Sequence, residues 1–183
     1  MSKTANGSNA GYYAKLALTL LIISAVVSGL LGLTNMITAD RIAEITAEKT
    51  AASMQEVLPA DSYTEISYSG EETIVAAAYQ AGDAGYIIEV TPSGFGGTID
   101  MVVGIGTDGA VTGVSIIDMS ETSGLGANAS KESFRSQYVG KSGTLAVSKD
   151  GGEIDALTGA TITSRAVTSG VNAALRAAAE IAG

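Results

Sequence analysis

The distribution of apolar residues divides the chain into two parts. An uncharged, mostly apolar segment runs from Leu16 to Ala39. With the helical rise of about 1.5 Å per residue it would be roughly 36 Å long, enough to cross a bilayer core of about 30 Å. A cleaved signal peptide is the alternative, but its apolar region is usually shorter than the run from Leu16 to Leu33, and residues 37–39 fit a cleavage site poorly. The pattern therefore favours a retained transmembrane helix over residues 16–39, after a tail of residues 1–15.

Small residues recur at every fourth position of this segment. Ser24, Ser28 and Gly32 form one row, and Ala25 and Gly29 form a second. Small side chains at this spacing let another transmembrane helix approach closely, although they are also common in membrane helices in general. The rows therefore favour packing against a partner helix only slightly.

The segment after the apolar stretch has the pattern of a connecting helix over residues 40–60, which Pro59 closes. Its apolar positions fall roughly on one helical face: Ile42, Ile45, Met54 and Leu58. We expect this helix to lift the rest of the chain off the membrane or to pack against it.

From Tyr63 onward, short β-rich runs alternate with turn residues. Candidate strands cover residues 86–91, 99–105, 110–117 and 144–148. The pair Asp108-Gly109, between the second and the third of these, is a strong hairpin signal. These runs predict a mixed, mostly antiparallel sheet.

Two helices complete the predicted domain. The first covers residues 130–138, with Ser130 as N-cap and with Phe134 and Tyr138 on one face. The second covers residues 164–182 and carries an apolar stripe, formed by Val167, Val171, Leu175 and Ala178. The sequence therefore predicts an α+β fold: a single N-terminal transmembrane helix, followed over residues 61–183 by the sheet and its flanking helices.

Composition removes many kinds of chemistry. The 183 residues include no Cys and no His. Disulfides, Cys-ligated iron–sulfur clusters, zinc sites built from Cys and His, and catalysis by Ser-His-Asp or Cys-His groups are all excluded. Any covalent link to a cofactor must therefore use a side chain other than Cys or His.

The distribution of charge bears on the class of partner and on the orientation of the chain in the membrane. The net charge is −9, and all 19 acidic residues lie at or after Asp40. An acidic domain repels phosphates, which argues against a nucleic-acid partner. Lysines before the apolar segment balance Arg41 and Lys49 after it, so positive charge alone does not decide orientation. The short tail and the acidic remainder favour a domain on the extracytoplasmic side.

One segment has the residues that bind phosphate. Thr158, Thr161, Thr163 and Ser164 place four hydroxyls just before the last predicted helix, separated by small residues. A helix N-terminus offers free N–H groups and the positive end of a dipole, and small residues allow close backbone approach. Thr163 or Ser164 can cap the helix. Taken alone, the segment is better explained as an ordinary helix cap after a glycine turn.

A family resemblance changes this interpretation. Asp155, two variable residues, Thr158 and then Gly159-Ala160-Thr161 match the motif of the FMN-binding domain in the G subunit of the Rnf electron-transport complex. The chain also resembles the related C subunit of the sodium-translocating NADH:quinone reductase. The resemblance implies that Thr161 carries FMN through a phosphoester, installed from FAD by a separate flavin transferase. It implies further that Asp155 and the small residues are part of the signal that the transferase recognises.

A second motif of the family reads Glu-Thr-Pro-Gly-Leu-Gly. Here residues 121–126 have Ser123 in place of the proline, and Met119 stands where relatives often have a His. The resemblance implies that this loop lies against the flavin, whereas a simple surface turn is the alternative. Its candidate cofactor-binding residues are Glu121, Thr122, Leu125 and Gly126.

Two further matches are less specific. Gly94-Phe95-Gly96-Gly97 resembles the family's Gly-Tyr-Gly-Gly, and the pattern favours core or rim packing for Phe95 over contact with the flavin ring. Lys141 follows Gly140 as a family Lys does. The resemblance makes Lys141 a candidate to neutralise flavin or phosphate charge, with a solvated surface lysine as the alternative.

The resemblance also implies a function. We expect a single-pass cell-membrane protein that relays electrons through FMN, within a ferredoxin:NAD oxidoreductase complex coupled to sodium or proton transport. Its partners would be the membrane and peripheral subunits of that complex, with the flavin transferase during maturation. No independent substrate site is expected. The alternatives are the C-type subunit of the quinone reductase, an autonomous membrane-tethered flavin reductase, and a flavin-free anchored binding module.

Overall fold

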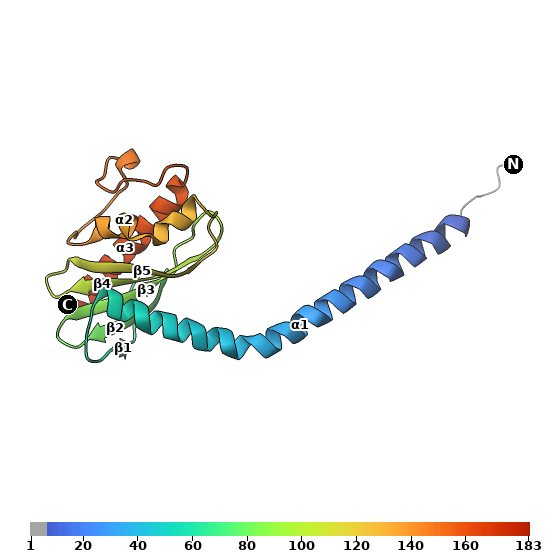
Figure 1. Cartoon of the computed structure of the whole chain (residues 1–183), viewed down its shortest axis with the longest axis horizontal. Helices are drawn as coiled ribbons and strands as arrows, with labels where there is room; N and C mark the ends of the chain where they lie inside the picture. The colour runs from blue at the N-terminus through green and yellow to red at the C-terminus, as the bar shows by residue number, and fades with distance from the viewer. Residues whose placement is uncertain (1–6) are drawn as a thin grey trace. The chain divides into compact units, whose positions relative to one another are not determined.

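The computed structural model describes residues 7–183 and begins with one long helix, α1, from Gly7 to Val57 (Figure 1). Residues 1–6 of the predicted tail lie outside the described residues, and the remainder of that tail is helical. The segments predicted as a membrane helix and a connecting helix form one continuous helix, because no proline occurs before Pro59. The chain divides into two compact units, Met1–Thr46 and Ala47–Gly183.

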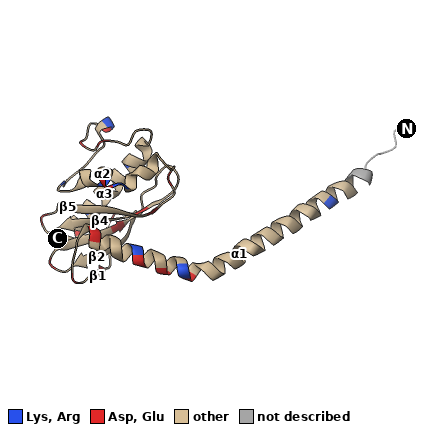
Figure 2. Cartoon of the chain, in the orientation of Figure 1, with Lys and Arg blue, Asp and Glu red and all other residues tan. Residues whose placement is uncertain are grey.

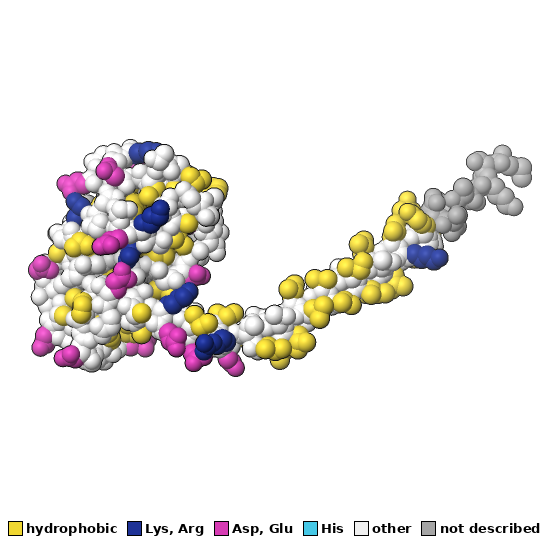
Figure 3. All heavy atoms as spheres, in the orientation of Figure 1, with side chains coloured by type: hydrophobic (Ala, Val, Ile, Leu, Met, Phe, Trp, Pro, Cys, Tyr) yellow, Lys and Arg dark blue, Asp and Glu magenta, His cyan; other side chains and the backbone are white. Residues whose placement is uncertain are grey.

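The first unit presents its apolar side chains to the surroundings. Large residues from Leu16 to Ile37 are exposed, and Figure 3 shows them along the helix. The sequence has no acidic residue before Asp40, and the N-terminal half of α1 carries no red in Figure 2. Among the described residues, α1 is the one helix long and apolar enough to cross a membrane by length and composition. The exposed apolar surface suits a lipid environment and supports membrane anchoring.

The second unit is built on a five-stranded antiparallel sheet. Its strands are β1 (Thr64–Ile66), β2 (Val75–Ala81), β3 (Gly85–Val90), β4 (Ile99–Gly106) and β5 (Val111–Met119), in the order β1-β2-β3-β4-β5. Every neighbouring pair is antiparallel, which confirms the predicted architecture. The predicted hairpin joins β4 to β5, and Gly109 at its turn has φ of 77°.

Each face of the sheet buries its own apolar cluster. The helix α3 (Thr161–Ala182) covers one face, where Val167, Val171 and Ala174 pack against Ile88 and Met101. The last turns of α1 cover the other face with three buried side chains, Met54, Val57 and Leu58. The sheet therefore buries only part of the predicted apolar face of the connecting segment. Met54 and Leu58 are buried, whereas Ile42 and Ile45 are exposed.

Helix α1 approaches the second face closely because glycines lie beneath it. A Cβ added at Gly104 would stand 2.7 Å from the carbonyl oxygen of Val57, and one at Gly113 would stand 2.9 Å from the Cα of Val57. The Thr112 hydroxyl donates to the same carbonyl over 2.7 Å. The end of α1 is therefore part of the folded domain.

Polar side chains also fasten this end of α1. The hydroxyl of Ser115 donates to a carboxylate oxygen of Glu56 over 2.8 Å, and the Arg135 guanidinium donates to the other oxygen over 3.0 Å. Burial would raise the pKa of Glu56, but the bonds from Ser115 and Arg135 outweigh it and hold the pKa below its usual value.

The predicted helix over residues 130–138 is interrupted in the structure. Residues 126–138 form three short pieces: η1 (Gly126–Ser130), α2 (Glu132–Arg135) and η2 (Ser136–Tyr138). Lys131, not Ser130, occupies the N-cap position of α2, because the Ser130 hydroxyl donates to the Ala127 carbonyl. The predicted face is nevertheless present, since Phe134 and Tyr138 are buried with their rings 5.8 Å apart.

The predicted strand over residues 144–148 is absent among the described residues. Val147 makes an isolated parallel bridge to Ile154, and the short η3 turn (Ser148–Asp150) follows it. The side chain of Asn172 on α3 bonds both the N–H and the carbonyl of Leu145, each over 2.8 Å. A side chain therefore takes the place that a neighbouring strand would have filled.

Candidate functional site

A cavity of about 400 Å³ opens where three loops meet the N-terminal end of α3. This volume lies within the range of roughly 300–1,000 Å³ that is usual for ligand pockets. The cavity is lined by Phe95, Glu121, Thr122, Leu125, Gly126, Lys149, Gly159, Ala160, Thr161, Ile162 and Thr163. The fold thus brings together seven of the ten residues that the sequence singled out, from segments far apart in the chain.

Glu121 holds the three segments in place. One of its carboxylate oxygens accepts the backbone N–H groups of Phe95 and Gly96, over 2.7 and 2.9 Å. The other accepts the hydroxyl of Thr163, in the first turn of α3, over 2.6 Å. Burial would raise the pKa of Glu121, but these bonds outweigh it and hold the pKa below its usual value. Glu121 is therefore an ionised structural link rather than a free acid or base.

Thr161 is the first residue of α3, three residues earlier than the predicted start of that helix. The N-cap position belongs to Ala160, and no side chain caps this end. The two predicted caps are occupied elsewhere: Thr163 donates to Glu121, while the Ser164 hydroxyl donates to the Ala160 carbonyl and accepts the Leu157 N–H. The first residues of α3 line the cavity, and no side chain competes with a ligand for the N–H groups at this end of the helix.

The turn before α3 depends on a glycine. Gly159 has φ of 77°, in the left-handed region that other residues rarely adopt. A Cβ at Gly159 would also stand 3.1 Å from a methyl carbon of Leu125, across the cavity. This glycine therefore lets the hydroxyl-rich segment turn into α3 directly beside the Glu121–Gly126 loop.

A cation stands beside the Thr161 hydroxyl. The Nζ of Lys149, in the η3 turn, donates to Thr161 Oγ1 over 2.9 Å. The sequence pattern did not single out Lys149, because the family resemblance pointed to Lys141. A signal was present: Lys149-Asp150-Gly151-Gly152 is a turn sequence shortly before the hydroxyl-rich segment.

Three predicted site residues do not line the cavity. Lys141 donates to Glu153 over 2.6 Å and lines a different hollow. Asp155 is exposed, and its backbone is bonded by the side chain of Gln137. Thr158 is exposed in the turn that precedes Ala160. Their assignment to the cofactor stays a prediction.

The cavity has an apolar rim. Phe95, Leu125 and Ile162 expose 69%, 44% and 52% of their surfaces, high values for such large side chains. Phe95 therefore lies at the rim and not in the core. A flat aromatic ligand would cover these three side chains and shield them from water.

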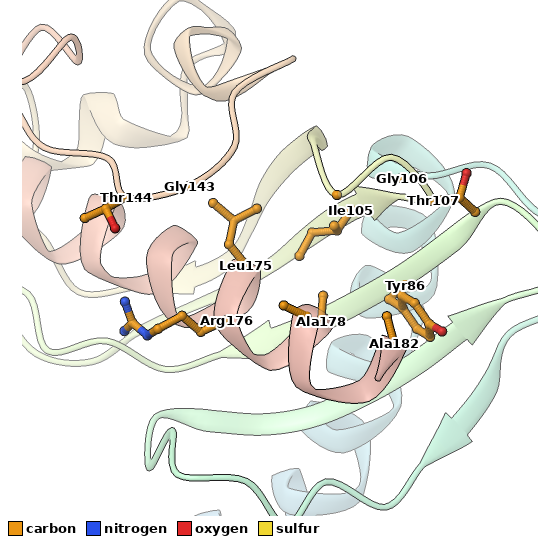
Figure 4. Close-up of a pocket in the computed structure, with 12 residues that line it drawn as sticks. Tyr86, Ile105, Gly106, Thr107, Gly143, Thr144, Leu175, Arg176, Ala178 and Ala182 are labelled. Atoms are coloured by element: carbon orange, nitrogen blue, oxygen red, sulfur yellow. The ribbon is translucent and has the colours of Figure 1, made fainter.

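A second cavity, of about 310 Å³, lies toward the other end of α3 (Figure 4). Its walls are mostly apolar and include Tyr86, Ile105 and Leu175. Its cation, Arg176, is engaged by the Glu72 carboxylate. The cavity contains no residue of the hydroxyl-rich or Glu121 segments, so it lacks the groups that a phosphorylated cofactor needs.

The first cavity fits FMN in its chemistry. The Thr161 hydroxyl lies beside the Lys149 amine at the uncapped end of α3, and the amine and the helix end both carry positive charge that would suit a phosphate. The apolar rim provides surface for the ring. The cavity thus offers separate surroundings for an anionic group and for a flat apolar ring.

Comparisons with known proteins agree with this chemistry. Residues 94–176 match the FMN-binding domain family, and residues 13–57 match the RnfG N-terminal region. The G subunit of the Na(+)-translocating ferredoxin:NAD(+) oxidoreductase complex of Acetobacterium woodii is 37% identical, over 88% of this chain and 89% of the relative. The proton-translocating counterpart of Clostridium ljungdahlii is 34% identical, over 87% and 86%.

The similarity extends to further bacteria. The G subunit of the ion-translocating oxidoreductase complex of Escherichia coli is 34% identical, over 89% of this chain and 88% of the relative. These matches cover the long helix and the domain together, which confirms the predicted G-type relationship. The chain therefore belongs to the family of G subunits of Rnf-type ion-translocating oxidoreductase complexes and carries the FMN-binding domain of that family.

Proposed function

We propose that the protein is a membrane-anchored electron carrier of an ion-translocating ferredoxin:NAD oxidoreductase complex, with FMN esterified to Thr161. The relatives from Acetobacterium woodii and Clostridium ljungdahlii supply the class of complex. The observation that carries the covalent site is the position of the Thr161 hydroxyl, on the cavity wall, at an uncapped helix end and 2.9 Å from a lysine amine.

The residues divide the work of holding the cofactor. Thr161 contributes the oxygen of the phosphoester, and a flavin transferase supplies FMN from FAD. Phe95, Leu125 and Ile162, which are exposed at the rim, would offer the ring an apolar surface. Glu121 keeps the loops at a fixed distance through its three hydrogen bonds. Bound FMN supplies exchange of one or two electrons, which lets it connect different kinds of carrier.

The surroundings of the cavity favour a carrier over an enzyme with its own substrate. The chain has no His or Cys, and Glu121 is the one carboxylate in the cavity lining. Its two oxygens are already bonded to Phe95, Gly96 and Thr163. A general base needs a free acceptor within reach of the proton that it removes, so Glu121 is poorly placed for that role.

We infer that the domain lies on the extracytoplasmic side, where it would exchange electrons with other subunits of the complex. The acidic composition of the domain supports this orientation. The uncharged stretch of α1 would hold the domain at the membrane. Attaching a thiol reagent that cannot cross membranes to a Cys introduced at Asp83, an exposed residue in the turn between β2 and β3, tests it. Labelling in intact cells supports the orientation, and labelling only after lysis refutes it.

The covalent site is tested by intact-mass measurement of the full-length chain, co-expressed with a flavin transferase. The wild type should gain the mass of FMN less one water, and Thr161→Ala should gain nothing. Thr73→Ala is a matched control, because it removes an exposed hydroxyl from a threonine that lies outside both the motif and the cavity lining. An adduct that persists in Thr161→Ala refutes the assignment. A wild type that never becomes yellow and fluorescent on a denaturing gel favours a flavin-free module instead.

An autonomous flavin reductase is the second candidate function, since the cavity opens at the surface and its apolar rim is exposed. The purified flavinylated chain should not oxidise NADH with an external acceptor at a useful rate without partner subunits. Sustained turnover by the isolated chain would favour the reductase.

A further inference from the structure

The turn that carries Lys149 is anchored next to Thr161. Lys149 belongs to the η3 turn, whose neighbouring residue Asp150 forms a bidentate ion pair with Arg165 of α3, over 2.7 and 2.6 Å. Arg165 follows Thr161 by four residues, so both lie on the same side of the helix. The turn is thus attached to the start of α3 at two adjacent points.

The base of the turn is also ordered. The N–H of Ser148 bonds the Ile154 carbonyl over 2.7 Å, and the side chain of Ile154 is fully buried. Lys149 itself is exposed and joins none of the ion pairs in the described part of the chain. Its amine therefore remains available for an anion at Thr161, although the fold determines where that amine lies.

We propose that Lys149 is the positioning residue for flavin attachment, and that it then pairs with the phosphodiester formed at Thr161. The proposal rests on the proposed function. In the attachment step, Thr161 Oγ1 forms a bond to the FMN phosphorus of FAD, the bond from that phosphorus to the oxygen bridging to AMP breaks, and AMP leaves. The hydroxyl proton passes to solvent, and no atom changes oxidation state.

The charge of Lys149 acts on both sides of this step. Before it, the ammonium holds the Thr161 oxygen in place through the 2.9 Å hydrogen bond. During it, the ammonium stabilises the negative charge that grows on the phosphoryl oxygens. After it, a cation in an otherwise acidic domain faces the single negative charge of the diester.

Lys141 is the matched control, because it carries the same charge on another loop. It donates to Glu153 over 2.6 Å and lines a separate hollow without Thr161. If general positive charge on the domain were sufficient, removing either lysine would have the same effect. The geometry instead assigns the effect to Lys149 alone.

The test follows FMN incorporation over time by intact mass, with full-length protein in detergent, purified transferase and FAD. Lys149→Gln should lower the rate roughly 10- to 100-fold, because a charged hydrogen bond is lost at the reacting group. Lys149→Arg should retain most of the rate, and Lys141→Gln should match the wild type. Melting curves of the unloaded proteins should coincide, since Lys149 is exposed.

A second readout uses protein that is already loaded. The phosphorus NMR resonance of the diester should shift in Lys149→Gln and remain unchanged in Lys141→Gln. Equal rates and equal resonances in the two glutamine variants overturn the proposal, as does loss of rate in Lys149→Arg as large as in Lys149→Gln. Failure of the proposed function looks different: the wild type gains no mass, or Thr161→Ala keeps the adduct.

Discussion

The Glu121 carboxylate should control the local stability of the cavity wall, and Glu121→Ala tests this. The substitution removes the acceptor of two backbone N–H groups, those of Phe95 and Gly96. A hydrogen bond to a charged group contributes roughly 1.5–3 kcal/mol, and the lower end applies to a half-buried carboxylate. Two such bonds give about 3 kcal/mol, which corresponds to roughly a 100-fold faster exchange of the two amides.

Hydrogen exchange followed by mass spectrometry measures this directly on peptides that cover residues 93–98. Glu121→Gln should show a smaller increase, of about 10-fold, because its amide oxygen still accepts both N–H groups but has no charge. Glu153→Ala is the control, since that carboxylate is exposed and pairs only with Lys141 among the described residues. Exchange in Glu121→Ala within about twofold of this control would refute the reasoning.

The stabilisation by Glu121 should also depend on pH in one direction only. Because the folded-state pKa of Glu121 is lowered, its contribution is present above the usual pKa of a glutamate. The contribution is lost as pH falls through the lowered folded-state pKa. The difference between wild type and Glu121→Ala, compared at equal pH, should therefore be constant near neutrality and shrink in acid. A difference that grows in acid would contradict the assignment.

Three other substitutions test the packing, each by chemical denaturation of the full-length chain in detergent. Burial raises the pKa of Asp100, and the facing charge of Asp118 raises it further. Ionised Asp100 therefore disfavours folding as pH rises. Asp100→Asn should raise the free energy of unfolding by about 0.5 kcal/mol at pH 7 but by little in acid. Gly113→Ala should cost about 1–3 kcal/mol, because its Cβ meets Val57; no change would contradict the close approach. Tyr138→Phe should cost about 1 kcal/mol, since it removes a buried 2.8 Å bond to a hydroxyl of α3; a neutral result would contradict that.

The parts of the fold that the sequence predicted are those with a local periodic pattern. The β-rich runs on either side of Asp108-Gly109 indicated the hairpin of β4 and β5, and the apolar stripe indicated α3. The strand predicted over residues 144–148 failed because a side chain decides that region: Asn172, distant in sequence, bonds the backbone of Leu145. No local pattern contains that information.

The site was predictable to the same degree. The motif around Thr161 and the segment from Glu121 to Gly126 were recognised from the sequence, and the fold places both on one cavity. The sequence could not show that Lys149, and not Lys141, lies beside Thr161, because this depends on how two loops return to the sheet. The start of α3 was misplaced because Thr163 and Ser164 resemble caps, although their hydroxyls bond Glu121 and Ala160.

The position of the α1 end in the core has a practical consequence for work with soluble fragments. A recombinant fragment that begins at residue 61, where the sequence pattern placed the domain boundary, would lack Met54, Val57 and Leu58. The side chains that these residues cover would then be exposed to water as one apolar surface, formed by Ala81, Ile87, Val102 and Ile117. Such a fragment should aggregate or bind detergent, whereas one that begins at Ala47 retains the residues of α1 that cover this face of the sheet.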